Sequence, residues 1–211
     1  MIGFIPKLLL ALVESSAGPE AVAEVKRRAG VAEDRHYRLN EICEDRQWRS
    51  LFVAACQTLR LEPAQAEEIF ADYFMQDVTR RFPEWFRMCR TAREFLERQP
   101  RIHNAFFQGI LSPEQREKMR DKFTLEADQQ DLIVHYCSDN QLCRLYEILA
   151  RKVFEHFGER GAVEQERCTH RGDTECVIRI RFLGKAGAND HDSRNSTCDG
   201  REVAASRRAD R

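Results

Sequence analysis

Residues 132–157 read LIVHYCSDNQLCRLYEILARKVFEHF and contain two different periodicities. The first part, 132–137, is short, apolar and partly β-branched, which is typical of a strand. From 141 to 157 the apolar residues recur every three or four positions, which predicts an amphipathic helix that ends near Gly158. The segment therefore predicts a helix that packs against a sheet.

Both flanks of this segment show the alternating polarity of strands. Residues 122–137 predict one hairpin with a polar turn at 128–131, and residues 162–182 predict a second hairpin with a turn at 170–173. Together with the helix, the strands follow the order β-β-α-β-β. This order predicts an antiparallel sheet packed on helices.

The first half of the chain predicts helices, several of which begin at a proline, a residue that the first helical turn tolerates well. The sequence therefore predicts an α+β fold, with an N-terminal helical subdomain followed by the antiparallel sheet. The predicted helices cover residues 2–13, 19–28, 46–59, 63–78, a stretch from 83, and 91–110 with a kink at Pro100.

The end of the chain differs in composition from the rest. Residues 183–211 contain no aromatic residue and are rich in Gly, Ala, Asp, Asn, Ser and Arg. Such a segment buries too little apolar surface to offset the entropy lost on ordering. We expect one folded domain over residues 1–182 and a disordered tail over 183–211.

Charge and hydropathy exclude several classes of protein. The 34 Lys and Arg against 35 Asp and Glu give a net charge of -1, whereas nucleic-acid binders carry a basic excess. No apolar run approaches the roughly 18 residues of a membrane span. The apolar run 8–13 is also too short for a secretion signal. We expect a cytoplasmic protein whose eight cysteines are reduced thiols or metal ligands.

His103 stands out because a single imidazole lies on a phenylalanine-rich helical face. Phe106, Phe107 and Ile110 follow it at helical spacings. One interpretation is a core histidine that hydrogen-bonds to backbone. The other is an axial ligand to heme iron, since neutral imidazole is a common proximal ligand and an apolar wall suits a porphyrin.

Three hydrogen-bonding side chains follow the apolar strand. Tyr136, Ser138 and Asn140 alternate along the sequence, so an extended chain places them on one face. They are suited to holding a carboxylate pair such as heme propionates. The alternative is a polar strand end in which Ser138 caps the following helix.

Several segments, taken in order, resemble the heme–nitric oxide/oxygen-binding (H-NOX) domain of soluble guanylate cyclase and bacterial gas sensors. The resemblance spans about residues 1–182 and identifies the chain as a member of this family. The segments are MIGFI at 1–5, EEIF at 67–70, REFL at 93–96 with His103, IVHYCS at 133–138, HFGE at 156–159 and the closing strand 177–182.

The resemblance implies a heme b cofactor and a role for each matching residue. His103 takes the place of the axial iron ligand, and Tyr136 and Ser138 take the places of two propionate-binding residues. The family's third propionate residue is an arginine, and Asn140 stands at that position. Arg144, one helical turn further on, is the candidate replacement for the missing charge.

The resemblance also implies which gas is bound. Oxygen-binding members carry a distal tyrosine, and counting from Tyr136 places Leu145 at that position, with Tyr146 next to it. An apolar distal pocket disfavours bound oxygen but still admits NO and CO. The resemblance implies a distal wall formed by Leu145 together with Ile5, Leu9, Phe74 and Val78.

We therefore expect a nitric oxide sensor rather than an enzyme. In the mechanism that the family suggests, NO weakens or breaks the bond between iron and His103, and the helix carrying His103 relaxes. The change is then read in trans by a histidine kinase or a diguanylate cyclase. A cysteine nucleophile with His103 or His135 as base is the enzymatic alternative, but no third orienting group accompanies these residues.

Four cysteines in the second half of the chain have spacings that suit a metal site. Cys137 and Cys143 flank the strand–helix junction, and Cys168 and Cys176 flank the second hairpin turn. Four thiolates are a common set of ligands for structural zinc, and His170 is a substitute ligand. The alternative is scattered buried thiols. A heme-free H-NOX-like domain that senses redox through such a site, or binds another apolar ligand, is the second functional hypothesis.

Overall fold

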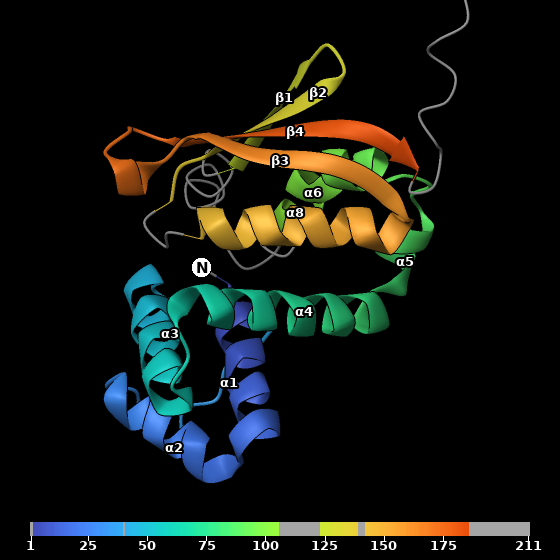
Figure 1. Ribbon diagram of the computed structural model, residues 1–211. Helices are drawn as coiled ribbons and strands as arrows, with labels where there is room; N and C mark the ends of the chain where they lie inside the picture. Colours follow the sequence, from blue (N-terminus) through green and yellow to red (C-terminus); the bar gives the residue numbers. More distant parts are fainter. Residues whose placement is uncertain (1, 40, 106–122, 139–141, 186–211) are drawn as a thin grey trace, which may run out of the picture.

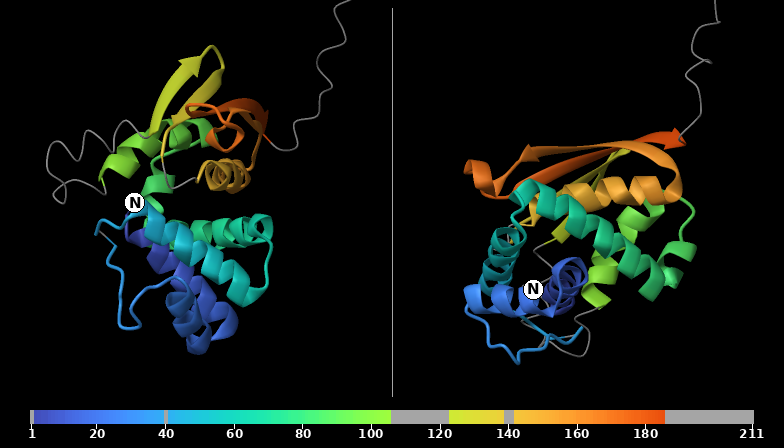
Figure 2. Two further views of the ribbon diagram at one scale, coloured as in Figure 1. Left: turned by 90° about the vertical axis from the view of Figure 1, so that its left-hand side faces the viewer. Right: turned by 60° about the horizontal axis from the view of Figure 1, so that its bottom comes forward.

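The computed structural model describes residues 2–39, 41–105, 123–138 and 142–185. Figure 1 shows a sheet on one side of the molecule, two helices beneath it, and a group of N-terminal helices beneath those. The side view in Figure 2 shows the same order of layers. This arrangement confirms the predicted α+β fold with an N-terminal helical subdomain.

The N-terminal helices begin at the positions that the prolines in the sequence indicated. Pro19, Pro63 and Pro83 are each the first residue of a helix, and Pro6 lies in the first turn of another. No helix in the described part of the chain combines the length and the apolar composition needed to cross a membrane. The helices are α1 (Phe4–Ala17), α2 (Pro19–Arg28), α3 (Asp45–Leu59), α4 (Pro63–Arg81) and α5 (Pro83–Arg87).

The second half of the chain has the predicted order β-β-α-β-β. All neighbouring strands are antiparallel, in the spatial order β1-β2-β4-β3, so the two hairpins meet through β2 and β4. The elements are β1 (Phe123–Asp128), β2 (Asp131–Tyr136), α8 (Cys143–Phe157), β3 (Glu159–Arg167) and β4 (Cys176–Lys185), with a short 3-10 turn η1 (Thr169–Arg171).

Several boundaries differ from the sequence prediction. β3 begins at Glu159, directly after α8, because Gly158 adopts a left-handed conformation with φ of 63° and redirects the chain at once. β4 continues to Lys185, three residues beyond the predicted domain end at 182. Helix α6 spans Ala92–Ala105 and contains Pro100, and the predicted continuation to 110 lies outside the described residues.

α8 packs closely on the sheet because β3 has a glycine where the helix approaches. A side chain at Gly161 would collide with the Phe154 ring of α8. The buried residues of α8 belong to the same apolar cluster as those of β2 and β4, among them Val134 and Ile178, which are fully buried. The core therefore continues from the sheet through α8.

The helical subdomain joins this core through α4, which lies along α8 in Figure 1. Ion pairs follow the junction: Arg144 Nε lies 2.9 Å from Glu67 Oε2, and Lys152 Nζ lies 2.8 Å from Asp72 Oδ1. Partly exposed pairs of this kind add little to stability. They instead fix which turns of the two helices face each other.

Candidate functional site

His103 lies in the last turn of α6 and is half-buried. The other end of this helix is anchored by two side chains. Glu159 Oε2 at the start of β3 accepts a hydrogen bond from the Ala92 backbone N–H at 3.2 Å, and Thr91 Oγ1 accepts one from Glu94 N–H at 3.1 Å. These contacts satisfy donors of the first turn and hold α6 against the sheet.

Tyr136 and Ser138 lie at the end of β2. The Ser138 hydroxyl oxygen is buried and forms no hydrogen bond of good geometry with any described residue, although it lies near the Tyr136 phenol. Burial raises the pKa of the Tyr136 phenol and the nearby Ser138 hydroxyl lowers it by less, so this side chain stays neutral and able to donate. An unpaired buried hydroxyl costs roughly 1–3 kcal/mol. Such a group indicates a ligand that would supply the missing partner.

The third position of this group cannot be placed, because Asn140 lies outside the described residues. Arg144, the candidate replacement for a propionate-binding arginine, has another partner. Its guanidinium forms the ion pair with Glu67 of α4, and its side chain is 55% exposed. Compensation for Asn140 by Arg144 therefore stays a prediction, and it would require Arg144 to leave Glu67.

The five residues predicted to form a distal wall belong to one apolar cluster. Leu9, Val78 and Leu145 are buried, and Ile5 and Phe74 pack against the same core while partly exposed. They come from α1, α4 and α8, three elements that are distant in sequence. The structure thus brings them into one apolar region.

Tyr146, next to Leu145 on α8, points toward the helix of His103. Its hydroxyl donates a hydrogen bond to Gln99 Oε1 at 3.0 Å, one helical turn before His103. Burial raises the pKa of this phenol. Tyr146 therefore links α8 to α6.

These residues fit the heme that the resemblance implies. His103 is only half-buried, the Ser138 hydroxyl is buried and lacks a partner within residues 2–39, 41–105, 123–138 and 142–185, and the wall residues are apolar. Imidazole, hydroxyl and apolar groups are the donor set that a porphyrin with an axial histidine and two propionates requires. The expected binding of the propionates is weaker than in a family member with arginine, since the neutral Asn140 stands where an arginine would hold a carboxylate.

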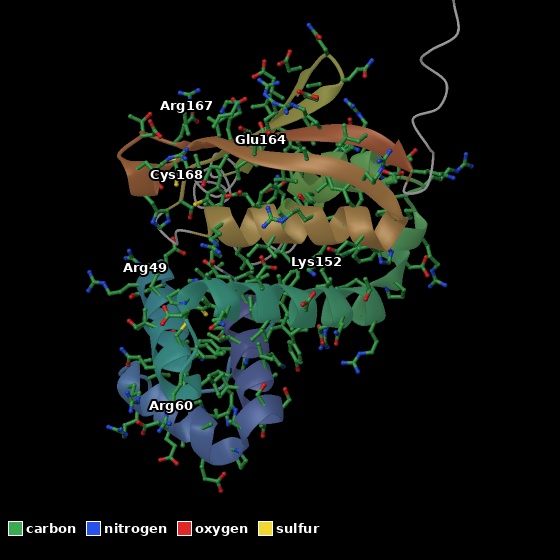
Figure 3. All side chains as sticks on the ribbon, in the orientation of Figure 1. Arg49, Arg60, Lys152, Glu164, Arg167 and Cys168 are labelled. Atoms are coloured by element: carbon green, nitrogen blue, oxygen red, sulfur yellow. The ribbon has the colours of Figure 1, made fainter. Side chains whose placement is uncertain are left out.

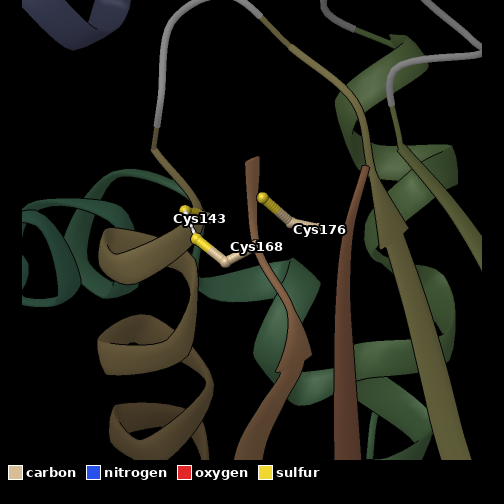
Figure 4. A group of neighbouring side chains, drawn as sticks. All are labelled: Cys143, Cys168 and Cys176. Atoms are coloured by element: carbon tan, nitrogen blue, oxygen red, sulfur yellow. Dashed lines mark hydrogen bonds between the residues drawn. The ribbon is translucent and has the colours of Figure 1, made fainter. Parts of the chain in front are cut away.

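Three of the four predicted zinc ligands come together. Cys143 at the start of α8, Cys168 after β3 and Cys176 at the start of β4 are buried, and their sulfurs lie within 4.8 Å of one another. Figure 4 shows the three side chains converging. Cys137 is exposed and does not belong to the group, so the prediction of four thiolates was wrong for this residue.

The sulfurs are too far apart for a disulfide and fit either hydrogen-bonded thiols or a tetrahedral metal. Cys143 Sγ and Cys168 Sγ are 3.9 Å apart. Two thiolates on tetrahedral zinc, with Zn–S bonds of about 2.3 Å, would be separated by about 3.8 Å, whereas a disulfide requires about 2.05 Å. The group supplies three ligands of the four that structural zinc usually takes.

The hairpin turn around the cluster contains two hydrogen bonds that the sequence did not predict. Asp173 Oδ2 accepts a hydrogen bond from Cys168 N–H at 2.7 Å, and Thr169 N–H lies 3.3 Å from Cys176 Sγ. Aspartate side chains often accept hydrogen bonds from nearby backbone in turns, so Asp173 in the turn after Cys168 could have indicated this contact. The buried side-chain nitrogen of Gln165 also lies near Cys143, and the sequence gave no signal of it.

The geometry can be compared with known proteins. A family model described as Haem-NO-binding matches residues 2–165. An H-NOX protein from S. oneidensis in the Fe(II)NO ligation state has a TM-score of 0.69 at 17% identity, over 87% of this chain and 100% of that chain. A variant of T. tengcongensis H-NOX has a TM-score of 0.67 at 17% identity, over 88% and 99%.

An oxygen-binding H-NOX domain related to soluble guanylate cyclases has a TM-score of 0.66 at 18% identity, over 88% of this chain and 96% of that chain. No match was found among curated proteins. The structural matches establish the fold, and the family match covers most of the chain. The chain therefore belongs to the Haem-NO-binding, or H-NOX, family, whose domains are heme-based gas sensors rather than catalysts.

Proposed function

We propose that this protein is a nitric oxide sensor in which His103 is the axial ligand of heme b. The observation on which the proposal rests is the buried hydroxyl of Ser138 near Tyr136, for which no described residue supplies a hydrogen-bond partner. Both hydroxyls would donate hydrogen bonds to the propionates, and such charge-assisted bonds are stronger than neutral ones. Asn140 would add a neutral amide in place of a guanidinium.

Heme iron supplies an open coordination position for a diatomic gas when it is bound. The residues around that position would select the gas. Leu145 provides no hydrogen-bond donor, and the hydroxyl of the neighbouring Tyr146 donates to Gln99 instead. We infer a distal side that admits NO and CO and disfavours oxygen, whose polar bound form needs a donor.

The signal would leave the site through α6. This helix has contacts with β3 through Glu159 and with α8 through the pair Gln99 and Tyr146. A change in the position of His103 would alter the balance between two arrangements of these contacts, which is what a switch requires. We infer that a separate histidine kinase or diguanylate cyclase in the cytoplasm reads the change.

Absorption spectra of the ferrous protein test this proposal. We expect wild type to show a heme band that shifts on adding NO, and His103→Ala to lose the wild-type ferrous spectrum. His36→Ala is the matched control, because His36 is an exposed loop histidine. A His103→Ala spectrum that matches wild type with and without NO would remove His103 from the proposed role.

The cysteine cluster favours a second candidate function, a thiol-based sensor. Three buried sulfurs at metal-ligand distances suit zinc, and loss of the metal would expose thiols that oxidise. This function does not need heme. Metal analysis of protein purified without chelators tests it: one zinc per chain that is lost in Cys168→Ser supports the site, and a metal-free wild type contradicts it.

A further inference from the structure

A basic groove lies between α2 and α3, away from the residues discussed so far. Its volume is about 460 Å³, and it is lined by Arg28 of α2 and by Arg46, Arg49, Ser50, Val53 and Gln57 of α3. The Arg28 guanidinium donates to Gln57 Oε1 at 3.4 Å and so connects the two helices across the groove. Figure 3 labels Arg49, whose side chain points outward from α3.

Two of the three arginines are not neutralised within the described part of the chain. Arg28 pairs with Glu24. Arg46 and Arg49 are exposed and form no ion pair with any residue that the structure describes. By contrast, Arg27, Arg35 and Arg81 each have a carboxylate partner.

The position of Arg46 and Arg49 on α3 is unfavourable for the helix itself. Arg46 lies in the first turn of α3, where the helix dipole favours acidic residues, and Arg49 lies in the second turn. They are also three positions apart, so their like charges repel. Asp45, four positions before Arg49, offsets part of this repulsion, and binding of an anion would offset the rest.

The surface around the arginines is also apolar. Val53, which lines the groove, is 54% exposed, and Ala54 lies beside it in the lining. Arginine together with exposed apolar side chains is a composition typical of protein–protein interfaces. We propose that the α2–α3 groove docks a segment of a partner protein that carries carboxylates next to apolar side chains.

Carboxylates on the partner segment would complement the positive charges of Arg46 and Arg49. The exposed apolar side chain in the groove favours a protein segment over a small phosphorylated anion. This surface goes beyond the proposed gas sensing, and its test requires neither heme nor NO. Its failure would therefore leave the proposed function untouched.

Fluorescence anisotropy of a short labelled peptide of Glu and Leu tests the proposal on the full chain. We expect the peptide to bind at low salt and to weaken several-fold between about 50 and about 300 mM salt, because exposed charges are screened. Arg46→Glu and Arg49→Glu are each expected to weaken binding roughly tenfold or more. The matched control is Arg60→Glu, an exposed arginine at the end of α3 that does not line the groove.

The proposal is overturned if the three variants behave alike, or if a peptide with Gln in place of Glu binds equally well. Saturable binding of pyrophosphate that depends on Arg49, without peptide binding, would assign the groove to a phosphorylated small molecule instead. Amide shift mapping on wild type guards against misfolded variants. Shifts at Ser50, Val53 and Ala54 support the proposal, and their absence at saturating peptide contradicts it.

Discussion

Two candidate sites, the cysteine cluster and the group of His103, Tyr136 and Ser138, can be compared. They differ in how many of their polar atoms find partners within the chain itself. The three sulfurs lie next to one another, and Thr169 donates to one of them. The Ser138 hydroxyl, in contrast, is buried and has no hydrogen-bond partner among the residues that the structure describes. A site for a single ion can close on its own ligands, whereas a site for a large planar ligand leaves polar groups unpaired until the ligand is present.

The largest effect is expected at the cysteine cluster. If Cys143, Cys168 and Cys176 hold zinc, Cys168→Ser should lower the free energy of unfolding by roughly 3 kcal/mol or more, since metal binding contributes directly to folding. Cys89→Ser is the control, because Cys89 is buried outside the cluster and should cost about 1 kcal/mol. Urea denaturation with and without a chelator measures both, and equal losses would mean that the cluster holds no metal.

Asp77 is the counter-example to Ser138, a buried polar group that the chain satisfies completely. Arg81 donates to both carboxylate oxygens, at 2.8 and 2.7 Å, and lowers the pKa of Asp77. The stabilisation is present above the unfolded pKa of about 4 and is lost as pH falls through the lower folded pKa. Asp77→Asn should cost about 1–2 kcal/mol at neutral pH.

Measuring the free energy of unfolding at several pH values distinguishes a contribution from the charge of Asp77 from a contribution of side-chain packing alone. The difference between wild type and Asp77→Asn should shrink as the pH falls below about 4. A difference that stays constant down to pH 2 would show that the charge of Asp77 does not contribute.

Ser138→Ala should have effects of opposite sign in the two forms of the protein. Without heme it removes an unpaired buried hydroxyl, so the free energy of unfolding should stay the same or rise by about 1 kcal/mol. With heme it removes a propionate contact and should speed heme loss several-fold. Chemical denaturation of the heme-free protein and heme transfer to apomyoglobin measure the two quantities. A heme-free variant less stable than wild type by more than 1 kcal/mol would mean that the hydroxyl already has a partner.

The smallest effect is expected for Arg144→Gln. The ion pair with Glu67 is partly exposed and should contribute about 0.5 kcal/mol or less. Heme loss should not change, because Arg144 is engaged with α4. A several-fold faster heme loss in this variant would identify Arg144 as the replacement for the family's arginine.

Much of the fold could be predicted because its signals are local. Prolines placed the starts of α2, α4 and α5, and alternating polarity placed both hairpins. The early start of β3 was missed, because it depends on the left-handed conformation of Gly158 rather than on polarity. The pairing of Arg144 with Glu67 was missed because it depends on how two distant helices pack.

The cysteine prediction failed at one residue for a geometric reason. Tyr136 lies opposite Cys176 in the register of β2 and β4. Cys137 is the next residue along an extended chain, so its side chain points to the other face. Cys137 is near the other cysteines in the sequence, but its side chain points away from them. Cys143, in contrast, reaches the cluster from the first turn of α8.

Imidazole rescue of His103→Gly tests the central claim most directly. This substitution removes the side chain at the end of α6 and leaves space that free imidazole can occupy. We predict that the ferrous variant loses the wild-type absorption spectrum and that added imidazole restores it, while His36→Gly responds to neither change. A His103→Gly protein that keeps the wild-type spectrum without imidazole would contradict the account.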